Sequence, residues 1–301
     1  MQNTKFYFFS GKGGVGKTSM ASATAIHYAE LGNKTLIVTT DPASNLSDVF
    51  QQEIGHREVS INGVDNLWAM EIDPDKAADE YRQRIVAPLR EFLPEETMRV
   101  VEEQFNSPCT TEIAAFDRFV DLMDDPAYDV VIFDTAPTGH TIRLLQLPVE
   151  WSKYIEKSPV NGQTCMGPLE AIQGSKEKYD RAIRILRDSA RTSFIFVLQP
   201  EETPIEEALR SSKELEAIGI RAIEIVINGI LPAEECVNPF FVKRKEMQDR
   251  YMKIIDDRFS GTSSRKMYLL SDEISGVEIL RQVGQMLFES KQNQYLKRAR
   301  L

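Results

Sequence analysis

A glycine-rich loop near the N-terminus places the strongest constraint on the fold of this chain. It follows an apolar run at residues 6–10 and opens a helical pattern at residues 19–31. The loop consists of Gly11, Lys12, Gly13, Gly14, Val15, Gly16, Lys17 and Thr18. Glycines allow successive backbone N–H groups to point at phosphate oxygens, and the helix adds the positive end of its dipole. The order of strand, loop and helix therefore predicts a phosphate-binding loop, with an ordinary glycine-rich turn as the alternative.

Three side chains of this loop suit a phosphate ligand that carries a metal ion. Lys17 can reach the terminal phosphates as a point charge. The Thr18 hydroxyl suits Mg²⁺, which prefers oxygen ligands. Lys12, taken by itself, is an additional basic residue near a phosphate or a solvated loop lysine. The residue types therefore predict a bound nucleotide with Mg²⁺.

Two aspartates follow apolar runs at the points where strands are expected to end. Asp41 follows residues 35–40, and Asp134 follows residues 130–133. Ligands bind outside the carboxyl ends of parallel strands, so both carboxylates are expected near the phosphates. Asp134 can hold the Mg²⁺ shell, and Asp41 can hold the metal's water or orient an attacking water. For Asp41 the alternative is that it only begins the turn before Pro42, and a buried strand that ends in Asp is common.

Composition and charge exclude several classes of protein. The chain has 301 residues, 42% of them hydrophobic, which is enough for a substantial core. Its net charge of −10 disfavours general nucleic-acid binding, which needs clustered Lys and Arg. No apolar stretch is long enough to span a bilayer, and no signal-peptide pattern is present, so we expect a cytoplasmic protein. The three cysteines are too few and too scattered for a disulfide framework, and a buried inert thiol is the default reading for each.

Short apolar runs alternate with helical patterns along most of the chain. Strands are predicted at residues 5–10, 35–40, 67–72, 129–134, 193–199, 222–228 and 266–270. Helices are predicted at residues 17–31, 206–218, 239–259 and 276–289. Several of the strands are apolar on both faces, as in a parallel sheet covered by helices on each side. The pattern predicts an α/β fold with a doubly wound, mostly parallel sheet.

Two long stretches do not fit a simple alternation of strands and helices. Residues 74–125 and 141–190 are rich in helix formers with a spacing near 3.6 residues. We expect them to form a helical subdomain inserted on one side of the sheet. Since there is no linker, repeat or low-complexity tract, residues 1–301 are expected to form a single P-loop ATPase domain with helical insertions.

The loop resembles the deviant Walker A loop shared by ParA, MinD, the nitrogenase iron protein and ArsA. The segments that begin at Asp41 and Asp134 carry the resemblance to the ArsA-type anion-pump ATPases, a family that also includes ATPases that target tail-anchored membrane proteins. It implies a homodimer in which Lys12 reaches the nucleotide of the partner subunit. It also implies that Asp41 positions the hydrolytic water and that Asp134 belongs to a second switch segment. The nucleotide-binding residues that it implies are the loop residues, Ser19 and Asn228, with Asn228 contacting adenine.

The cysteines separate the two branches of this family. Cys109 is expected in the first turn of a helix, where the dipole favours the thiolate, and Cys165 also precedes a helical pattern. Soft metalloids such as As(III) and Sb(III) prefer thiolate ligands. Both segments resemble the metalloid-binding segments of arsenite-pump ATPases, which makes His140 a candidate accessory ligand or, alternatively, a satisfied polar histidine. Cys236 lacks the second cysteine of the targeting branch's zinc clasp, so it is expected to be a loop cysteine.

The resemblance implies an ATPase subunit of an arsenite or antimonite efflux pump. ATP and Mg²⁺ are the expected cofactors, and As(III) or Sb(III) is the expected activator. The expected partners are an integral-membrane arsenite carrier, which would hold the protein at the inner face of the membrane, and an arsenic metallochaperone. The alternative is a nucleotide-gated targeting chaperone for tail-anchored proteins. A partitioning ATPase of the ParA/MinD kind is a weaker alternative, because the chain lacks a basic surface.

Overall fold

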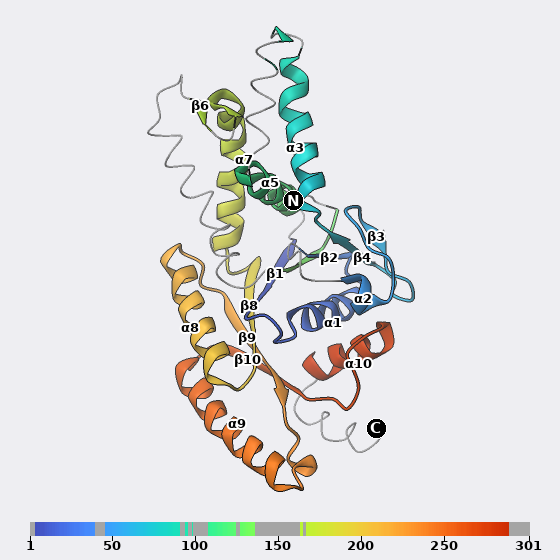
Figure 1. The fold of residues 1–301 in the computed structure, drawn as a ribbon, viewed down its shortest axis with the longest axis vertical. Coiled ribbons are helices and arrows are strands. Elements are labelled where there is room, and N and C mark those ends of the chain that lie inside the picture. Colours follow the sequence, from blue (N-terminus) through green and yellow to red (C-terminus); the bar gives the residue numbers. More distant parts are fainter. Residues whose placement is uncertain are drawn as a thin grey trace.

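The structure is a computed structural model of the chain and has a long central sheet with helices on both faces (Figure 1). It describes residues 4–39, 46–90, 94–95, 98, 108–124, 127–135, 163–164 and 167–288. The eight strands of the sheet lie in the order β10-β9-β8-β1-β5-β2-β4-β3. All neighbouring pairs are parallel except β3 and β4, which are antiparallel. The predicted doubly wound, mostly parallel α/β fold is confirmed.

The strands match the predicted runs closely. In chain order they are β1 (Lys5–Ser10), β2 (Thr35–Thr39), β3 (Val59–Ser60), β4 (Leu67–Glu71), β5 (Val130–Asp134), β8 (Thr192–Leu198), β9 (Ile223–Ile230) and β10 (Ser263–Tyr268). Two further short strands, β6 (Gln163–Thr164) and β7 (Gly167–Pro168), form a separate antiparallel pair. The sequence reading did not predict β3, β6 or β7, because two-residue strands carry no periodicity.

The helices divide between the two faces of the sheet. In chain order they are α1 (Lys17–Glu30), α2 (Leu46–Phe50), α3 (Pro74–Leu89), α5 (Pro108–Asp124), α7 (Leu169–Arg187), α8 (Glu202–Ala217), α9 (Pro239–Arg258) and α10 (Val277–Phe288). Helices α1, α2 and α10 share one buried apolar cluster with the sheet. Helices α3, α5, α7, α8 and α9 share the other. A short 3₁₀ helix, η1 (Ala233–Glu235), precedes α9.

Strand β1 lies in the middle of the sheet and is buried on both faces. Its Phe8 ring stacks on Phe133 of β5 at 4.8 Å and on Phe194 of β8 at 4.6 Å. On the opposite face Phe9 belongs to the cluster that contains α1. Successive side chains of β1 thus point into the two apolar clusters on opposite faces of the sheet. Because both faces are buried, the sequence of such a strand is a continuous apolar run.

Helices α3, α5 and α7, here called the helical group, pack on one another and extend beyond the sheet toward the top of Figure 1. Helices α3 and α5 come from the first stretch predicted to be helical, and α7 comes from the second. Helix α3 begins after Asp73, whose side chain accepts hydrogen bonds from the N–H groups of Asp75 and Lys76. The division of the chain into one domain with insertions stays a prediction.

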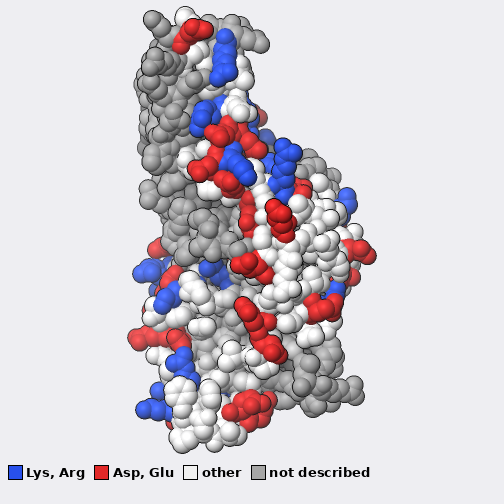
Figure 2. Space-filling view, turned by 45° about the vertical axis from the view of Figure 1, so that its right-hand side comes forward, with Lys and Arg blue, Asp and Glu red and all other residues white. Residues whose placement is uncertain are grey.

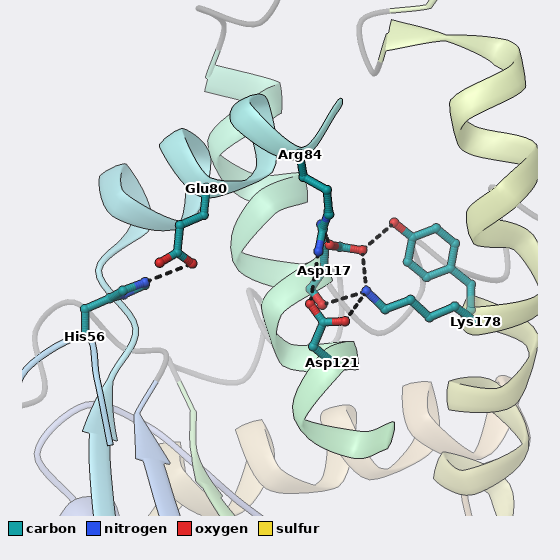
Figure 3. A network of polar contacts seen from close by, with 7 residues as sticks. His56, Glu80, Arg84, Asp117, Asp121 and Lys178 are labelled. Atoms are coloured by element: carbon teal, nitrogen blue, oxygen red, sulfur yellow. Dashed lines mark hydrogen bonds and ion pairs between the residues drawn. The ribbon is translucent and has the colours of Figure 1, made fainter. Parts of the chain in front are cut away.

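A network of charged side chains joins the three helices of the helical group (Figure 3). Its centre is Asp117 of α5, which is 2% exposed and forms an ion pair with Arg84 of α3. From α7, Lys178 lies 2.8 Å from the Asp117 carboxylate and the Tyr179 hydroxyl donates to it at 3.2 Å. Asp121, one turn along α5, contacts both Arg84 and Lys178. One buried carboxylate thus connects three helices.

The surface carries charges of both signs. Figure 2 shows Lys and Arg side chains interspersed with Asp and Glu over the face that it draws. Among the described residues on that face (Figure 2), the acidic side chains lie close to basic ones over several elements. None of the described helices is long and apolar enough to cross a membrane.

Candidate nucleotide-binding site

Residues 11–18, here called the nucleotide loop, connect β1 to α1 in a conformation that needs glycine. Gly11 has φ +146°, and a Cβ added there would lie 2.2 Å from the Val197 carbonyl oxygen. Gly16 has φ +91° and directly precedes α1. A Cβ at Gly16 would lie 2.4 Å from the amide nitrogen of Asn228. Side chains at these two positions would collide with neighbouring strands, so the loop is built as a narrow backbone turn at a helix N-terminus, as an anion site requires.

The two lysines of the nucleotide loop differ in exposure. Lys17 is the first residue of α1 and is only 7% exposed, so its charge is held close to the helix N-terminus. Lys12 is exposed. A lysine at the surface can reach a ligand outside its own subunit, whereas Lys17 can reach only a ligand of its own loop. The geometry is compatible with the separate roles that the sequence analysis gave them.

Two of the three predicted Mg²⁺ residues, Thr18 and Asp134, meet at the carboxyl end of β5. The Thr18 hydroxyl donates to Asp134 Oδ2 at 2.7 Å. Asp134 is fully buried and ends β5, which pairs in parallel with β1. The next residue, Thr135, donates through its hydroxyl to the Phe9 carbonyl at 2.8 Å and so fixes the strand end beside the loop. A hydroxyl and a carboxylate side by side are hard oxygen donors, and this donor set fits Mg²⁺.

Asn228 contacts the backbone of the nucleotide loop at Val15. Its Nδ2 donates to the Val15 carbonyl at 2.9 Å, and its Oδ1 accepts a hydrogen bond from the Gly229 N–H at 2.8 Å. The sequence analysis placed Asn228 at the nucleotide but missed that it holds the loop. The two residues are 213 positions apart, and no local pattern relates them.

Several predicted site residues lie outside the described part of the chain. They are Asp41, His140 and Cys165, together with the side chain of Cys109. Helix α5 begins at Pro108, which confirms that the Cys109 backbone belongs to the first turn of a helix. The proposed roles of these residues stay predictions.

Cys236 follows η1 and is partly buried. Its Sγ donates to the Pro232 carbonyl at 3.2 Å. Within the described residues, His, Cys, Asp and Glu side chains form no group of three that could hold a metal ion. The contact with Pro232 fits the loop cysteine that the sequence analysis expected.

The chain is similar to known ATPases over nearly its whole length. Residues 4–289 match the family model described as "Anion-transporting ATPase". The chain is 48% identical to the "Putative arsenical pump-driving ATPase" of Halobacterium salinarum, over 97% of this chain and 45% of that protein. It is 48% identical to the Escherichia coli "Arsenical pump-driving ATPase", over 76% of this chain and 40% of that protein. It is also 34% identical to the "ATPase ASNA1 homolog 2" of Paramecium tetraurelia, over 95% of this chain and 94% of that protein. The chain thus spans a little under half the length of the two arsenical-pump relatives.

Proposed function

Because this chain belongs to the anion-transporting ATPase family, we propose that it binds and hydrolyses ATP with Mg²⁺ at the nucleotide loop. The observation that carries the proposal is the hydrogen bond of 2.7 Å between Thr18 and the buried Asp134. It joins the loop to the end of the neighbouring strand, where a nucleotide-bound metal ion needs oxygen ligands. A loop that only turned the chain would not need a buried carboxylate beside a hydroxyl.

Each part of the nucleotide loop has a role in this proposal. The backbone N–H groups and the helix N-terminus bind phosphate oxygens, and Lys17 adds a positive charge beside them. Thr18 and Asp134 would hold Mg²⁺, which neutralises charge on the phosphates when it is bound. Asp41 orients the attacking water, and the exposed Lys12 reaches the nucleotide of a second copy of the chain. Catalysis then consists of positioning and charge stabilisation, as phosphoryl transfer requires.

We further propose that As(III) or Sb(III) activates hydrolysis by binding Cys109 and Cys165, with His140 as an accessory ligand. The names of the two arsenical-pump relatives and the metalloid preference for thiolates support this. The protein would act as a homodimer and would dock on an integral-membrane arsenite carrier at the inner face of the membrane. An arsenic metallochaperone would deliver the metalloid.

Steady-state ATP hydrolysis with and without arsenite tests both the proposed ATPase site and the proposed activation by a metalloid. Wild type is compared with Lys17→Ala, with the double variant Cys109→Ser plus Cys165→Ser, and with Cys236→Ser as the matched cysteine control. We expect stimulation by arsenite in wild type and in Cys236→Ser, no stimulation in the double variant, and no hydrolysis by Lys17→Ala. Hydrolysis by Lys17→Ala at the wild-type rate would overturn the ATPase site. Equal stimulation by arsenite in wild type, in Cys236→Ser and in the double variant would overturn the metalloid site but not the ATPase site.

The second candidate function is a nucleotide-gated targeting chaperone for tail-anchored proteins. It is supported by the match to the ASNA1 homologue of Paramecium tetraurelia, which covers nearly the full length of both chains. The test is co-purification with a transmembrane peptide in the presence of ATP and of ADP. Capture of the peptide that depends on ATP, without any effect of arsenite on hydrolysis, would favour this function over the pump.

A further inference from the structure

The carboxyl end of β9 extends beyond the strand beside it. The ladder between β8 and β9 ends at the pair Leu198 and Ile227, but β9 continues to Ile230. On its other side β9 stays paired with β10, and the Leu269 N–H donates to the Ile230 carbonyl at 2.9 Å. The register of β9 against β10 shifts between Ile227 and Ile230, where β9 advances three residues while β10 advances two. The Gly229 carbonyl and the Leu231 N–H lie beyond the last pair of the ladder with β8.

A buried glutamine of α9 takes the place of the missing strand. Gln248 is 4% exposed. Its Nε2 donates to the Gly229 carbonyl at 2.9 Å, and its Oε1 accepts a hydrogen bond from the Leu231 N–H at 2.8 Å. A side-chain amide has the same donor and acceptor as a peptide group, so it can pair with two strand groups as another strand would. An apolar side chain of similar volume would fill the space but would leave both backbone groups unpaired in the interior.

The strand end that Gln248 completes is the one that carries Asn228. The Gly229 N–H donates to Asn228 Oδ1 at 2.8 Å, and Asn228 Nδ2 donates to the Val15 carbonyl of the nucleotide loop at 2.9 Å. A continuous series of hydrogen bonds thus runs from α9 through the end of β9 to the nucleotide loop. Gly229 has φ +70°, a conformation that glycine adopts without steric cost. Fixing both sides of Gly229 fixes the plane of the Asn228 amide.

We propose that Gln248 is a positioning residue for the nucleoside part of the bound nucleotide. It acts through Gly229 on the Asn228 amide, which lies beside the phosphate-binding turn but outside it. This inference rests on the proposed nucleotide site. It predicts that Gln248 affects affinity for the base and ribose more strongly than affinity for the phosphates, which bind directly to the loop amides and Lys17.

Equilibrium binding of ligands to the full chain separates the contribution of the base and ribose from that of the phosphates. The probes are ADP, GDP and inorganic pyrophosphate, each with Mg²⁺, measured by titration calorimetry. The variant is Gln248→Met, and the matched control is Glu246→Met, an exposed position on the same helix. We expect Gln248→Met to weaken ADP binding about tenfold, which corresponds to one lost hydrogen bond of about 1.4 kcal/mol. It should reduce the preference for ADP over GDP and weaken pyrophosphate binding much less than ADP binding, and Glu246→Met should bind like wild type.

A second variant gives a pH signature that does not depend on whether Gln248→Met folds. In Gln248→Glu, the protonated carboxyl group can donate to the Gly229 carbonyl and accept from the Leu231 N–H, as the amide does. The ionised form cannot donate, and it places a charge in the interior. ADP affinity relative to wild type should therefore recover as the pH is lowered from about 8 to about 6, since burial raises a carboxyl pKa into this range.

The outcomes distinguish the inference from the function on which it rests. If wild type binds neither ADP nor pyrophosphate, the proposed nucleotide site is wrong and the role of Gln248 falls with it. If wild type binds both, but Gln248→Met loses equal affinity for both or for neither, the positioning role is overturned and the nucleotide site stands. An ADP affinity of Gln248→Glu that follows wild type at every pH would also overturn the role.

Discussion

The nucleotide loop and the helical group are held in place by different interactions. The loop is fixed by backbone geometry and short hydrogen bonds, such as those from Asn228 to Val15 and from Thr18 to Asp134. The helical group is fixed by ion pairs that converge on Asp117. Backbone turns are specified by residues next to one another, whereas the ion network needs side chains from three helices at once. The loop therefore has a local sequence signature, although two distant residues also hold it, whereas the ion network of the helical group has no local signature.

The network also changes the ionisation of its neighbours. Burial raises the pKa of Tyr81 to about 12, and the charge of Asp117 adds to this effect. Burial raises the pKa of Tyr179 as well, again with a contribution from Asp117. Both hydroxyls are protonated at neutral pH, as tyrosine ordinarily is, and Tyr179 donates to the carboxylate. The helical group therefore combines one buried negative charge with donors that keep their protons.

The largest expected effect is in the helical group. Asp117→Ala leaves Lys178 and Arg84 without their buried counter-charge, and it should lower the free energy of unfolding by about 3 kcal/mol. The measurement is urea unfolding followed by circular dichroism. Asp121→Ala is the matched control on the same helix; because Asp121 is 34% exposed, we expect a loss of about 1 kcal/mol. Equal losses for the two variants would show that the burial of Asp117 does not matter.

The corresponding change in the nucleotide loop is expected to be smaller and to act through the backbone. Gly16→Ala forces a left-handed φ on a residue with a side chain and brings Cβ to 2.4 Å from Asn228 Nδ2. We expect a loss of about 2 kcal/mol in the free energy of unfolding. Gly13→Ala is the control, because no described atom lies within 4 Å of a Cβ added there. If the control lost as much as Gly16→Ala, the local conformation of Gly16 would not be what fixes the loop.

Loss of the Thr18 hydroxyl tests the hydrogen bond to the strand end. Thr18→Val keeps the shape of the side chain and should lower the free energy of unfolding by about 1.5 kcal/mol, because the hydrogen bond is to a carboxylate. It should also raise the Mg²⁺ concentration needed for ADP binding. Thr18→Ser keeps the hydroxyl and should behave like wild type in both measurements. A Val variant with unchanged Mg²⁺ dependence would remove Thr18 from the metal site.

The smallest expected effect depends on pH. The N–H groups of Lys76 and Asp75 at the start of α3 lower the pKa of Asp73 below its ordinary value of 3.8. Because the folded-state pKa is the lower one, the stabilisation is fully present above the unfolded value and is lost as the pH falls through the folded value. Asp73→Ala should therefore cost about 1 kcal/mol near neutral pH.

The difference between Asp73→Ala and wild type should shrink as the pH falls below 3.8 and through the lower pKa of the folded state, because the carboxyl group then becomes protonated in wild type. Asp79→Ala, at an exposed position on the same helix, is the control. A difference between Asp73→Ala and wild type that persisted unchanged in acid would mean that capping by the carboxylate is not its cause.

The sequence predicted the loop and its meeting with Asp134 because both are local patterns of glycines and apolar runs. It placed the end of β9 at Asn228, two residues before the strand ends at Ile230. The groups at this strand end pair with the amide of Gln248 from a different helix, a contact that no local pattern predicts. The sequence also placed the start of α8 at Glu206, four residues late. The residue that caps α8, Glu201, makes no side-chain capping hydrogen bond, so the usual signal was absent.

The ion network around Asp117 could not be predicted for a related reason. Asp117 and Tyr179 are 62 positions apart, and each fits an ordinary helical pattern when it is read alone. Only the packing of α5 against α7 gives them a common environment. Periodicity predicts which face of a helix is buried, but it does not predict which charged residues from different helices will share that interior.

The central position of β1 has a consequence for the synthesis of the protein. Strand β1 leaves the ribosome well over a hundred residues before β5 and β8, the two strands with which it pairs. Until then its aromatic residues have neither neighbouring strand, and the helix that follows it still lacks α10, which covers it in the finished fold. Such long-range pairing slows folding and prolongs the exposure of apolar segments. A nascent chain that stops before residue 192 should therefore engage general chaperones, and release from them should begin only after β8 has emerged.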